Sequence, residues 1–361
     1  MMKNENQFVK LIVIIGARPQ FIKHYPFEEA SKGKLDLVTV HTGQHYDNNM
    51  SAVFFEQLGM KKPHFLLNVG SGKHGEQTAK MMIEIEDICC KIKPQALMVY
   101  GDTNSTLAGA LVASKLHIPL IHVEAGLRSY NKKMPEEVNR ILTDHISDLL
   151  FVPSKTAVTN LKNEGINKGI YLVGDIMKDL ILYIKEKNLF ILPDIEKPYY
   201  YVTLHRPYNV DHIDRFIKIL SYLNELKCRV IFAAHPRTLA RINISEDGRN
   251  IVSSLENITV ISPQGYLENI GYLIKAEALI TDSGGMQKEA YWLNKKCVTI
   301  RSETEWVETM KGNANSLVFQ DLDKIQHHLN DISCNFDSSL YGNGDSAIQM
   351  VDTIIDYINA I

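Results

Sequence analysis

Short apolar runs recur along the whole chain, and the segments between them show an apolar residue every three to four positions. Runs such as Leu11–Ile15 and Ala96–Tyr100 are almost continuously apolar, as is typical of strands buried on both faces of a parallel sheet. Intervening segments such as Pro135–Ile146 have the spacing of amphipathic helices. The pattern therefore predicts an α/β protein in which parallel strands alternate with helices.

The expected strands form two groups. The first group comprises Leu11–Ile15, Leu37–His41, Ala96–Tyr100, Leu120–Val123, Leu150–Val152 and Tyr171–Val173. The second group comprises Tyr200–Leu204, Arg229–Ala233, Ile258–Ile261, Ala278–Thr281 and Cys297–Ile300. The clearest helical stretches are Ser105–Lys115, Pro135–Ile146 and Gly285–Leu293.

A polar stretch with two prolines, Lys185–Pro198, separates the two groups. With 361 residues the chain is long enough for two domains of ordinary size. We expect one doubly wound, Rossmann-like domain over residues 1–180 and a second over residues 198–343, joined by a linker over residues 181–197 and facing each other across a cleft. The final stretch, residues 344–361, has a helical pattern and can close either domain.

Composition narrows the possible functions. The net charge of −3 and the lack of a basic block argue against binding to nucleic acid or to a membrane surface. No apolar run approaches the roughly 18 residues of a membrane span, and Leu11–Ile15 is too short for the apolar region of a signal peptide. The five cysteines are odd in number and lack metal-ligand spacing. These features predict a cytoplasmic protein with reduced thiols and no bound metal.

Polar and charged side chains follow nearly every expected strand. Those after the first group are Arg18, Gln44, His45, Asp102, Glu124 and Arg128, and those after the second are His205, Arg206, His235, Arg237, Asp282 and Ser283. Each has a structural explanation when taken alone: Asp102 can cap the next helix, and Glu124 can pair with Arg128. Helix caps do not explain histidine and arginine at so many strand ends. Because ligands bind beyond the carboxyl ends of parallel strands, we interpret these residues as an active site.

The segment "PEEVNR" begins a helix, with Pro135 suited to its first turn. Glu136 and Arg140 are one helical turn apart and share a face. They can form an exposed ion pair of a few tenths of a kcal/mol, or they can carry an acid and a cation into the cleft below Glu124. The spacing alone is compatible with both interpretations.

The segment "TDSGGMQKE" predicts a site for a nucleotide diphosphate. A strand, then Ser283, Gly284 and Gly285, then a helix leaves backbone N–H groups pointing outward, where a phosphate can approach glycines that lack Cβ atoms. Glu289, one turn further on, can accept hydrogen bonds from ribose hydroxyls. The first loop, "GARPQF", lacks the later glycines of a dinucleotide fingerprint, and no P-loop is present, which argues against NAD and ATP.

Eight segments in order resemble the non-hydrolysing UDP-N-acetylglucosamine 2-epimerases. They are "GARPQFIK", "HTGQHYD", "GDTNSTLAGA", "HVEAGLRS", "MPEEVNR", "TLHR", "HPR" and "TDSGGMQKEA", in a match that runs from Gly16 to about Glu308. The resemblance implies the two-domain GT-B fold, a homodimer, and a C-terminal helix, residues 344–361, that completes the first domain.

The resemblance also implies an isomerase that inverts C2 of a UDP-sugar without NAD or metal, by anti elimination of UDP to a glycal and re-addition of UDP. The acid/base residues would be Asp102, Glu124 and Glu136, and which of them removes the C2 proton stays open. The departing diphosphate would meet Arg140 and His205. The residues that would hold UDP are Arg18, His235, Ser283, Gly284, Gly285 and Glu289.

Within the family, "GARPQF", "HTGQHYD" and "TEWVE" are more similar to the branch that acts on UDP-2,3-diacetamido-glucuronic acid for surface polysaccharides. Further candidates for contacts with the sugar or its loops are Gln44, His45, Arg128 and Arg301, although Arg301 beside Trp306 can equally be a packing residue. The alternative functions are a GT-B glycosyltransferase with a separate acceptor, a hydrolysing epimerase that releases free sugar, and a non-catalytic nucleotide-sugar sensor.

Overall fold

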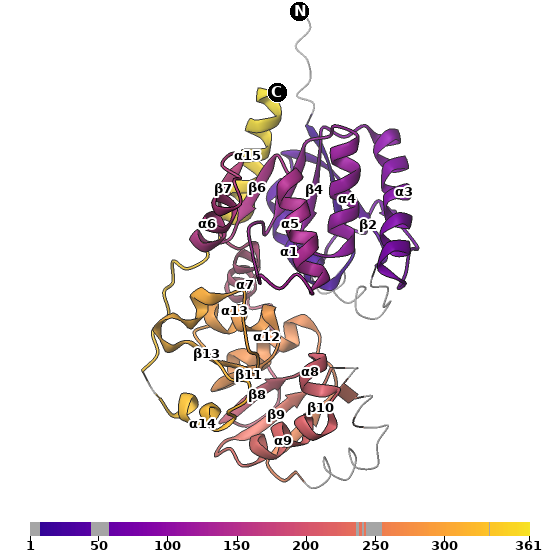
Figure 1. Cartoon of the computed structure of the whole chain (residues 1–361). Helices are drawn as coiled ribbons and strands as arrows, with labels where there is room; N and C mark the ends of the chain where they lie inside the picture. The colour runs from indigo at the N-terminus through magenta and orange to yellow at the C-terminus, as the bar shows by residue number, and fades with distance from the viewer. Residues whose placement is uncertain (1–7, 45–57, 236–237, 240–241, 243–254, 332) are drawn as a thin grey trace, which may run out of the picture. The chain divides into compact units, whose positions relative to one another are not determined.

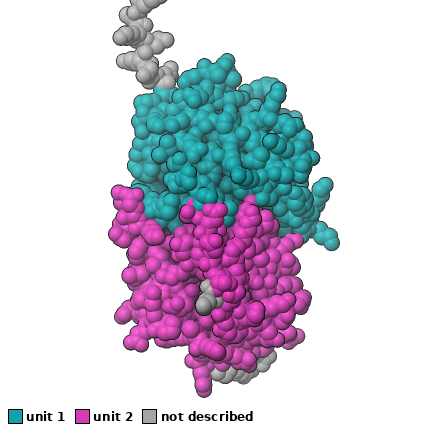
Figure 2. Space-filling view, turned by 90° about the vertical axis from the view of Figure 1, so that its left-hand side faces the viewer, with its two compact units in different colours: residues 1–183, 339–361 teal, residues 184–338 magenta. Residues whose placement is uncertain are grey.

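The computed structural model describes residues 8–44, 58–235, 238–239, 242, 255–331 and 333–361. The chain divides into two compact units, which are coloured separately in Figure 2. Unit 1 comprises residues 1–183 and 339–361, and unit 2 comprises residues 184–338. The C-terminal segment therefore belongs to the same unit as the N-terminal half of the chain.

Unit 1 is built on a seven-stranded sheet in the order β3-β2-β1-β4-β5-β6-β7, and all of its pairings are parallel. Its strands are β1 Val9–Ile15, β2 Leu35–His41, β3 Phe65–Leu66, β4 Ala96–Tyr100, β5 Leu120–Val123, β6 Leu149–Val152 and β7 Ile170–Leu172. Its helices are α1 Arg18–Ser31, α3 His74–Ile92, α4 Asn104–Lys115, α5 Pro135–Ile146, α6 Lys155–Asn163, α7 Ile176–Lys187 and α15 Ser346–Ala360.

Alternate residues of each central strand enter two separate cores. In β1, Leu11 and Val13 pack into one core, whereas Ile12 and Ile14 pack into the other. Helices α3, α4 and α5 lie side by side (Figure 1), and residues of α3 and α4 form the second core. The sheet is thus covered on both faces, which explains why its strands read as continuous apolar runs.

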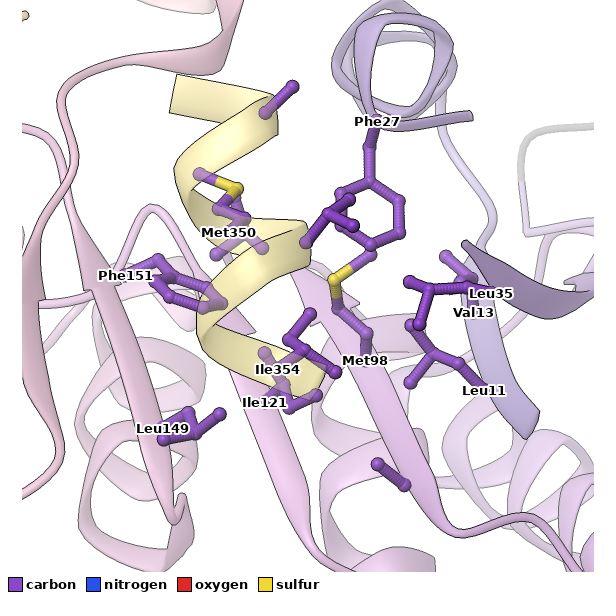
Figure 3. Packing of buried hydrophobic residues seen from close by; sticks show 14 of the residues in the cluster. Leu11, Val13, Phe27, Leu35, Met98, Ile121, Leu149, Phe151, Met350 and Ile354 are labelled. Atoms are coloured by element: carbon purple, nitrogen blue, oxygen red, sulfur yellow. The ribbon is translucent and has the colours of Figure 1, made fainter. Parts of the chain in front are cut away.

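The C-terminal helix α15 closes the first core. Its side chains Met350 and Ile354 are buried with Phe27, Met98 and Phe151 (Figure 3). Helix α15 also packs along α1. Because most of its inward side chains are fully buried, removal of α15 would expose the β4–β6 part of the sheet to water.

Unit 2 has a six-stranded parallel sheet in the order β10-β9-β8-β11-β12-β13. Its strands are β8 Tyr199–Thr203, β9 Arg229–Ala233, β10 Ile258–Ile261, β11 Ala278–Thr281, β12 Lys296–Thr299 and β13 Asn315–Leu317. Its described helices include α8 Pro207–Val210, α9 Ile213–Asn224, α12 Tyr266–Lys275, α13 Gly284–Trp292, α14 Asp323–Asn330 and the 3₁₀ segment Val307–Asn313. Two apolar cores again flank the sheet.

The predicted α/β class with two doubly wound parallel sheets is confirmed. Two strands, β3 and β13, lie outside the predicted set. Both are edge strands of two or three residues, too short to leave a periodic pattern. Within the described part of the chain, no helix has the length and apolar content needed to cross a membrane.

The segment expected as a linker, residues 181–197, is divided between two structures. Its first part continues helix α7, inside which the boundary between the units falls. Its later part packs on unit 2: the Ile191 N–H donates to the Leu267 carbonyl at 3.2 Å, and Gly271 lies directly against the Ile191 carbonyl. Only a glycine at position 271 allows this approach, because a Cβ there would be 1.8 Å from that oxygen.

Candidate active site

In unit 1, Asp102 and Glu124 follow the adjacent parallel strands β4 and β5. Glu124 has a φ of +70°, a left-handed conformation that costs a non-glycine residue about 1–2 kcal/mol. The backbone N–H groups of Glu124 and Ala125 both donate to the Phe151 carbonyl, at 3.0 and 3.1 Å, which holds the turn in this conformation. Such strain is concentrated at functional sites, where the surrounding structure enforces it.

Gly101 makes room for the Glu124 carboxylate. It has a φ of +62°, and a Cβ added to it would lie 3.3 Å from Glu124 Oε2 and 3.6 Å from Lys23 Nζ. Lys23, on helix α1, forms an ion pair with Glu124, and both side chains are almost buried. Lys23 was absent from the sequence-based candidates, although it is the last residue of "GARPQFIK".

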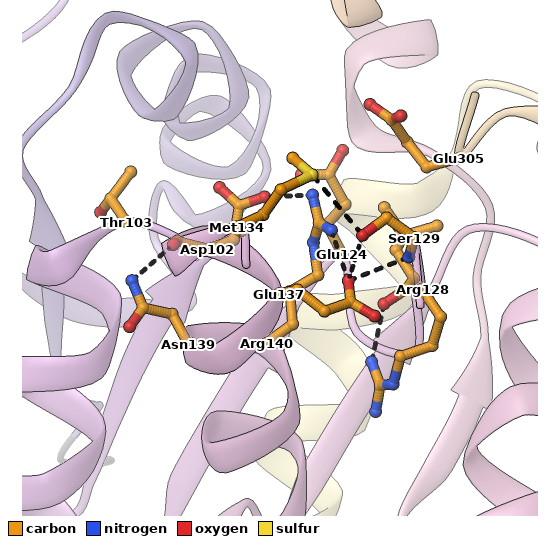
Figure 4. Close-up of polar contacts among 12 residues, drawn as sticks. Asp102, Thr103, Glu124, Arg128, Ser129, Met134, Glu137, Asn139, Arg140 and Glu305 are labelled. Carbon is orange, nitrogen blue, oxygen red and sulfur yellow. Dashed lines mark hydrogen bonds and ion pairs between the residues drawn. The ribbon is translucent and has the colours of Figure 1, made fainter. Parts of the chain in front are cut away.

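Asp102 is held at both its side chain and its backbone by helix α5 (Figure 4). Arg140 Nη2 donates to the Asp102 carboxylate at 2.5 Å, and Asn139 Nδ2 donates to its carbonyl at 2.9 Å. Burial raises the pKa of Asp102, and the negative charge of Glu124 raises it further. The positive charge of Arg140 lowers this pKa, but the net pKa stays above its usual value. A carboxyl group with a raised pKa is suited to accept and return a proton near neutral pH.

The two glutamates at the start of α5 have different surroundings. Glu136 is exposed and is close enough to Asp102 to raise the pKa of that carboxyl group. Glu137 is fully buried, and its carboxylate contacts Arg140 Nη1 at 3.0 Å. Arg140 therefore bridges Glu137 and Asp102 in the structure (Figure 4).

Glu137 also organises the loop between β5 and α5. Its carboxylate accepts hydrogen bonds from the Ser129 N–H at 2.9 Å, the Ser129 hydroxyl at 3.0 Å and the Tyr130 N–H at 2.8 Å. Burial alone would raise the pKa of Glu137, but these hydrogen bonds and Arg140 lower it below its usual value. Sequence reasoning missed Glu137 because its neighbour has the same chemistry.

Arg128, a candidate for a sugar contact, is enclosed within unit 1. Its guanidinium contacts Asp144 at 2.7 Å and Glu164 at 2.7 and 2.8 Å, and the side chain has no exposed surface. Arg128 could also have paired with Glu124, but it binds Asp144 and Glu164 instead, and Glu124 pairs with Lys23. The structure thus gives Arg128 a role in holding the domain together.

Two glutamines join the strand ends. Gln44 Oε1 accepts hydrogen bonds from the Ser105 N–H at 3.0 Å and the Ser105 hydroxyl at 2.6 Å, so it connects the end of β2 to α4. Gln20 accepts from the N–H of Gly16 at 2.7 Å and donates to the Tyr100 carbonyl at 2.8 Å, which connects the ends of β1 and β4. Gln20 was another residue that the sequence did not single out. His45 and the side chain of Arg18 lie outside the described part.

In unit 2, Asp282 organises the loop that follows β8. Its buried carboxylate accepts from the N–H groups of His205 and Arg206, both at 3.0 Å, and from Asn209 Nδ2 at 3.0 Å. His205 Nδ1 lies 3.2 Å from Asp282 Oδ1, so the carboxylate orients the ring and turns Nε2 away from itself. The His235 ring lies 5.5 Å from the His205 ring, centroid to centroid. The two histidines are thus neighbours at the strand-end edge of unit 2.

The start of helix α13 has the form of an anion site. Ser283 caps the helix by accepting from the Met286 N–H, and a Cβ on Gly285 would meet nothing within 4 Å. At Gly284, by contrast, a Cβ would be 2.8 Å from Glu305 Oε1, which belongs to an ion pair with Arg301 at 3.0 Å.

Two other candidates near this helix are buried. Glu289 is 4% exposed, so little of its side chain is available to a ligand. Arg301 is also 4% exposed, and Trp306 beside it stacks over the Lys288 ammonium, which lies 3.5 Å from the ring centroid. Among the residues that the structure describes, no group of three or more His, Cys, Asp and Glu side chains could hold a metal ion.

Comparison with known proteins gives a consistent assignment. The sequence profile of the family described as UDP-N-acetylglucosamine 2-epimerase matches residues 28–355. The chain is 46% identical to a UDP-N-acetylglucosamine 2-epimerase of Methanococcus maripaludis over 88% of this chain and 89% of the relative. It is 44% identical to the UDP-2,3-diacetamido-2,3-dideoxy-D-glucuronate 2-epimerase of Pseudomonas aeruginosa over 95% of this chain and 99% of the relative.

Among solved structures, the chain is similar to UDP-GlcNAc 2-epimerase of Methanocaldococcus jannaschii in complex with UDP-GlcNAc and UDP. The TM-score is 0.85 at 42% sequence identity, over 97% of this chain and all of that one. Two doubly wound units with these topologies make the fold GT-B. On the profile match and these identities, the chain belongs to the UDP-N-acetylglucosamine 2-epimerase family.

Proposed function

We propose that this protein is a UDP-sugar 2-epimerase that inverts C2 of UDP-N-acetylglucosamine or of a 2,3-diacetamido-glucuronate relative. The observation that supports this most strongly is the pair of carboxyl groups at adjacent strand ends, Asp102 and Glu124, each beside a buried cation. The raised pKa of Asp102 adds the proton-transfer capacity that the reaction needs. Relatives that act on the two sugars are almost equally similar to this chain, so the motif "TEWVE" is what favours the uronate.

In the proposed reaction, a carboxylate removes the C2 proton while the bond between C1 and the diphosphate oxygen breaks. The electron pair of the C–H bond forms the C1–C2 double bond of a glycal, and UDP leaves with the pair of the C–O bond. Protonation of C2 from the opposite face and return of UDP to C1 give the manno epimer. Asp102, Glu124 and Glu136 are the proposed acids and bases, and two of them acting on opposite faces account for inversion.

The proposed contacts to UDP use cations and backbone amides. His205, oriented by Asp282, and Arg140 stabilise the departing diphosphate. The N-terminus of α13, with Ser283, Gly284 and Gly285, binds phosphate through N–H groups and the helix dipole. His235, Glu289 and Arg18 complete the proposed UDP site.

Incubation of the enzyme with UDP-N-acetylglucosamine, and separately with its 3-acetamido uronate analogue, in deuterated water tests the proposal. We expect NMR to show deuterium at C2 of a UDP-linked manno product from one or both substrates. Free sugar without UDP-linked product would instead indicate the hydrolysing reaction, and transfer of sugar only when an acceptor is added would indicate a glycosyltransferase. Folded protein that exchanges neither substrate at C2 would refute the epimerase assignment.

We further propose that the enzyme works in the cytoplasm as a homodimer. Exposed apolar side chains on two helices of unit 1 support an interface there. Ile83 on α3 is 63% exposed, and on α5 Val138 is 40% and Leu142 46% exposed. A molar mass measured by light scattering that corresponds to a single chain at micromolar concentration would contradict the dimer.

A further inference from the structure

We propose that His122 is a positioning residue that sets the relative placement of Asp102 and Glu124. The inference rests on the proposed function, because it takes these two carboxyl groups as reacting groups. His122 lies in the middle of β5, and its side chain is completely buried. Its two hydrogen bonds reach neither strand-end carboxylate, so it acts on them through the backbone.

The His122 ring spans the two strand ends. Its Nε2 donates to the Gly101 carbonyl at 2.7 Å, and its Nδ1 donates to Asp144 Oδ1 at 2.7 Å. Carbonyl and carboxylate oxygens are both acceptors, so the ring connects two acceptors that lie on different elements. Burial alone would raise the pKa of Asp144, but His122 and Arg128 lower it below its usual value, consistent with an ionised acceptor.

Each end of this connection is adjacent to a reacting residue. Gly101 directly precedes Asp102 and has a positive φ. Asp144 Oδ2 accepts the Gly126 N–H at 3.1 Å, two residues after the strained Glu124, and also binds Arg128 Nη1 at 2.7 Å. A single ring thus joins the turn after β4 to the turn after β5.

Stability alone does not account for this arrangement. A buried ion pair generally contributes no more to stability than well-packed apolar residues of similar volume. The ring lies beside the apolar cores of the sheet, where such residues would pack. What the ring adds is directional: two short hydrogen bonds restrict the distance between two turns that both adopt left-handed backbone conformations.

Two substitutions separate the two hydrogen bonds. In His122→Asn the amide can reach the position of Nδ1 and bind Asp144, but it is too short to reach Gly101. In His122→Gln the amide can reach Gly101 but not Asp144. Misplacement of a reacting group by about 1 Å can cost on the order of 100-fold in rate, so we expect kcat to fall about 10- to 100-fold in both variants.

Asp179→Ala is the matched control. Asp179 is also buried in unit 1, where it accepts the Ala347 N–H at 2.8 Å at the start of α15, and it has no contact with the β4 or β5 turns. Its loss therefore disturbs the same unit at the start of α15 and leaves both His122 hydrogen bonds in place. All three variants and the wild type are compared by circular dichroism and by UDP affinity before kinetics.

The decisive measurement is a ratio, which does not depend on the fraction of active enzyme. Each turnover either completes epimerisation or releases the glycal and UDP, and a misplaced acid returns the proton more slowly. We expect both His122 variants to release more glycal per epimerised product than the wild type, with KM for the UDP-sugar unchanged. The isotope effect on kcat for the C2-deuterated substrate should become smaller, because the return of the proton then limits more of the rate than cleavage of the C2–H bond does. Asp179→Ala should keep the wild-type ratio and isotope effect.

The outcomes distinguish the two hypotheses. Wild-type enzyme without C2 exchange would refute the proposed function itself. Active wild type together with His122 variants that keep the wild-type product ratio and isotope effect, whatever their kcat, would refute the positioning role and leave the epimerase assignment intact. The same would follow if Asp179→Ala changed the ratio as much as the His122 variants do.

Discussion

The ion pair between Lys23 and Glu124 can be tested by replacing Lys23 with methionine. The two side chains are only 7% and 11% exposed, so the substitution removes a cation from beside a nearly buried carboxylate. Breaking a buried pair in this way costs about 3–5 kcal/mol, because the nearly buried carboxylate loses the charge that compensates it in this pair. An exposed pair contributes only about 0–1 kcal/mol.

Lys34→Met is the matched control for this substitution. Lys34 pairs with Asp352 at 2.8 Å in the same unit, but its side chain is 44% and that of Asp352 56% exposed. We therefore expect Lys23→Met to lower the free energy of unfolding by about 3–5 kcal/mol, and Lys34→Met by less than about 1 kcal/mol. A second substitution, Glu124→Gln in the Lys23→Met background, removes the charge of the remaining carboxylate and should recover part of the lost stability.

The assay is urea unfolding followed by far-UV circular dichroism. Tryptophan emission alone is unsuitable, because both tryptophans, Trp292 and Trp306, belong to unit 2, whereas Lys23 and Glu124 belong to unit 1. Equal stability losses in Lys23→Met and Lys34→Met would refute the reasoning, and so would a double variant no more stable than Lys23→Met.

Three further predictions follow from the same unit. Glu124→Gln should abolish C2 exchange in deuterated water while UDP affinity, measured by calorimetry, stays at the wild-type value; near-normal exchange would exclude Glu124 as a reacting group. Gly101→Ala should lower the free energy of unfolding by about 1–2 kcal/mol and also lower kcat. Gly33→Ala is its control, because Gly33 has a φ of +70° but no atom lies within 4 Å of the new Cβ. This substitution should lower stability and leave kcat unchanged. Burial, and to a smaller extent the nearby His64, lowers the pKa of His24 from 6.5 to about 4. Between these pH values the unfolded chain binds more protons than the folded one. The free energy of unfolding should therefore fall by about 3 kcal/mol as the pH drops from 6.5 to 4. His24→Gln should flatten that part of the pH–stability curve in urea titrations, and an unchanged slope would contradict this.

The strand-end rule found much of the candidate site from the sequence. In a doubly wound fold, the carboxyl ends of neighbouring parallel strands lie at the same edge of the sheet. The rule therefore placed Asp102 and Glu124 at one edge of the first sheet, and His205 and Asp282 at one edge of the second, without any coordinates. It did so because strands buried on both faces are visible as continuous apolar runs. The strand order of the structure then makes each pair neighbours.

The strand-end rule could not predict which side chains these residues contact. Lys23 is 101 positions from Glu124 in the chain, and His122 is 22 positions from Asp144. Sequence spacing predicts contacts within one helix or strand, whereas these contacts depend on how a helix lies across the sheet. Arg128 shows the converse: at a strand end it looked available to a ligand, yet its guanidinium is enclosed by two carboxylates.

The pattern of apolar positions was sufficient for the α/β class, the two sheets and most strand boundaries, because burial on both faces of a sheet imposes a local pattern on each strand. The chemistry of the strand ends indicated which residues to consider. Only the tertiary structure distinguished Glu136 from Glu137. The two are adjacent and chemically identical, and their different burial arises because the Ser129–Tyr130 backbone turns its N–H groups toward one carboxylate and leaves the other in water.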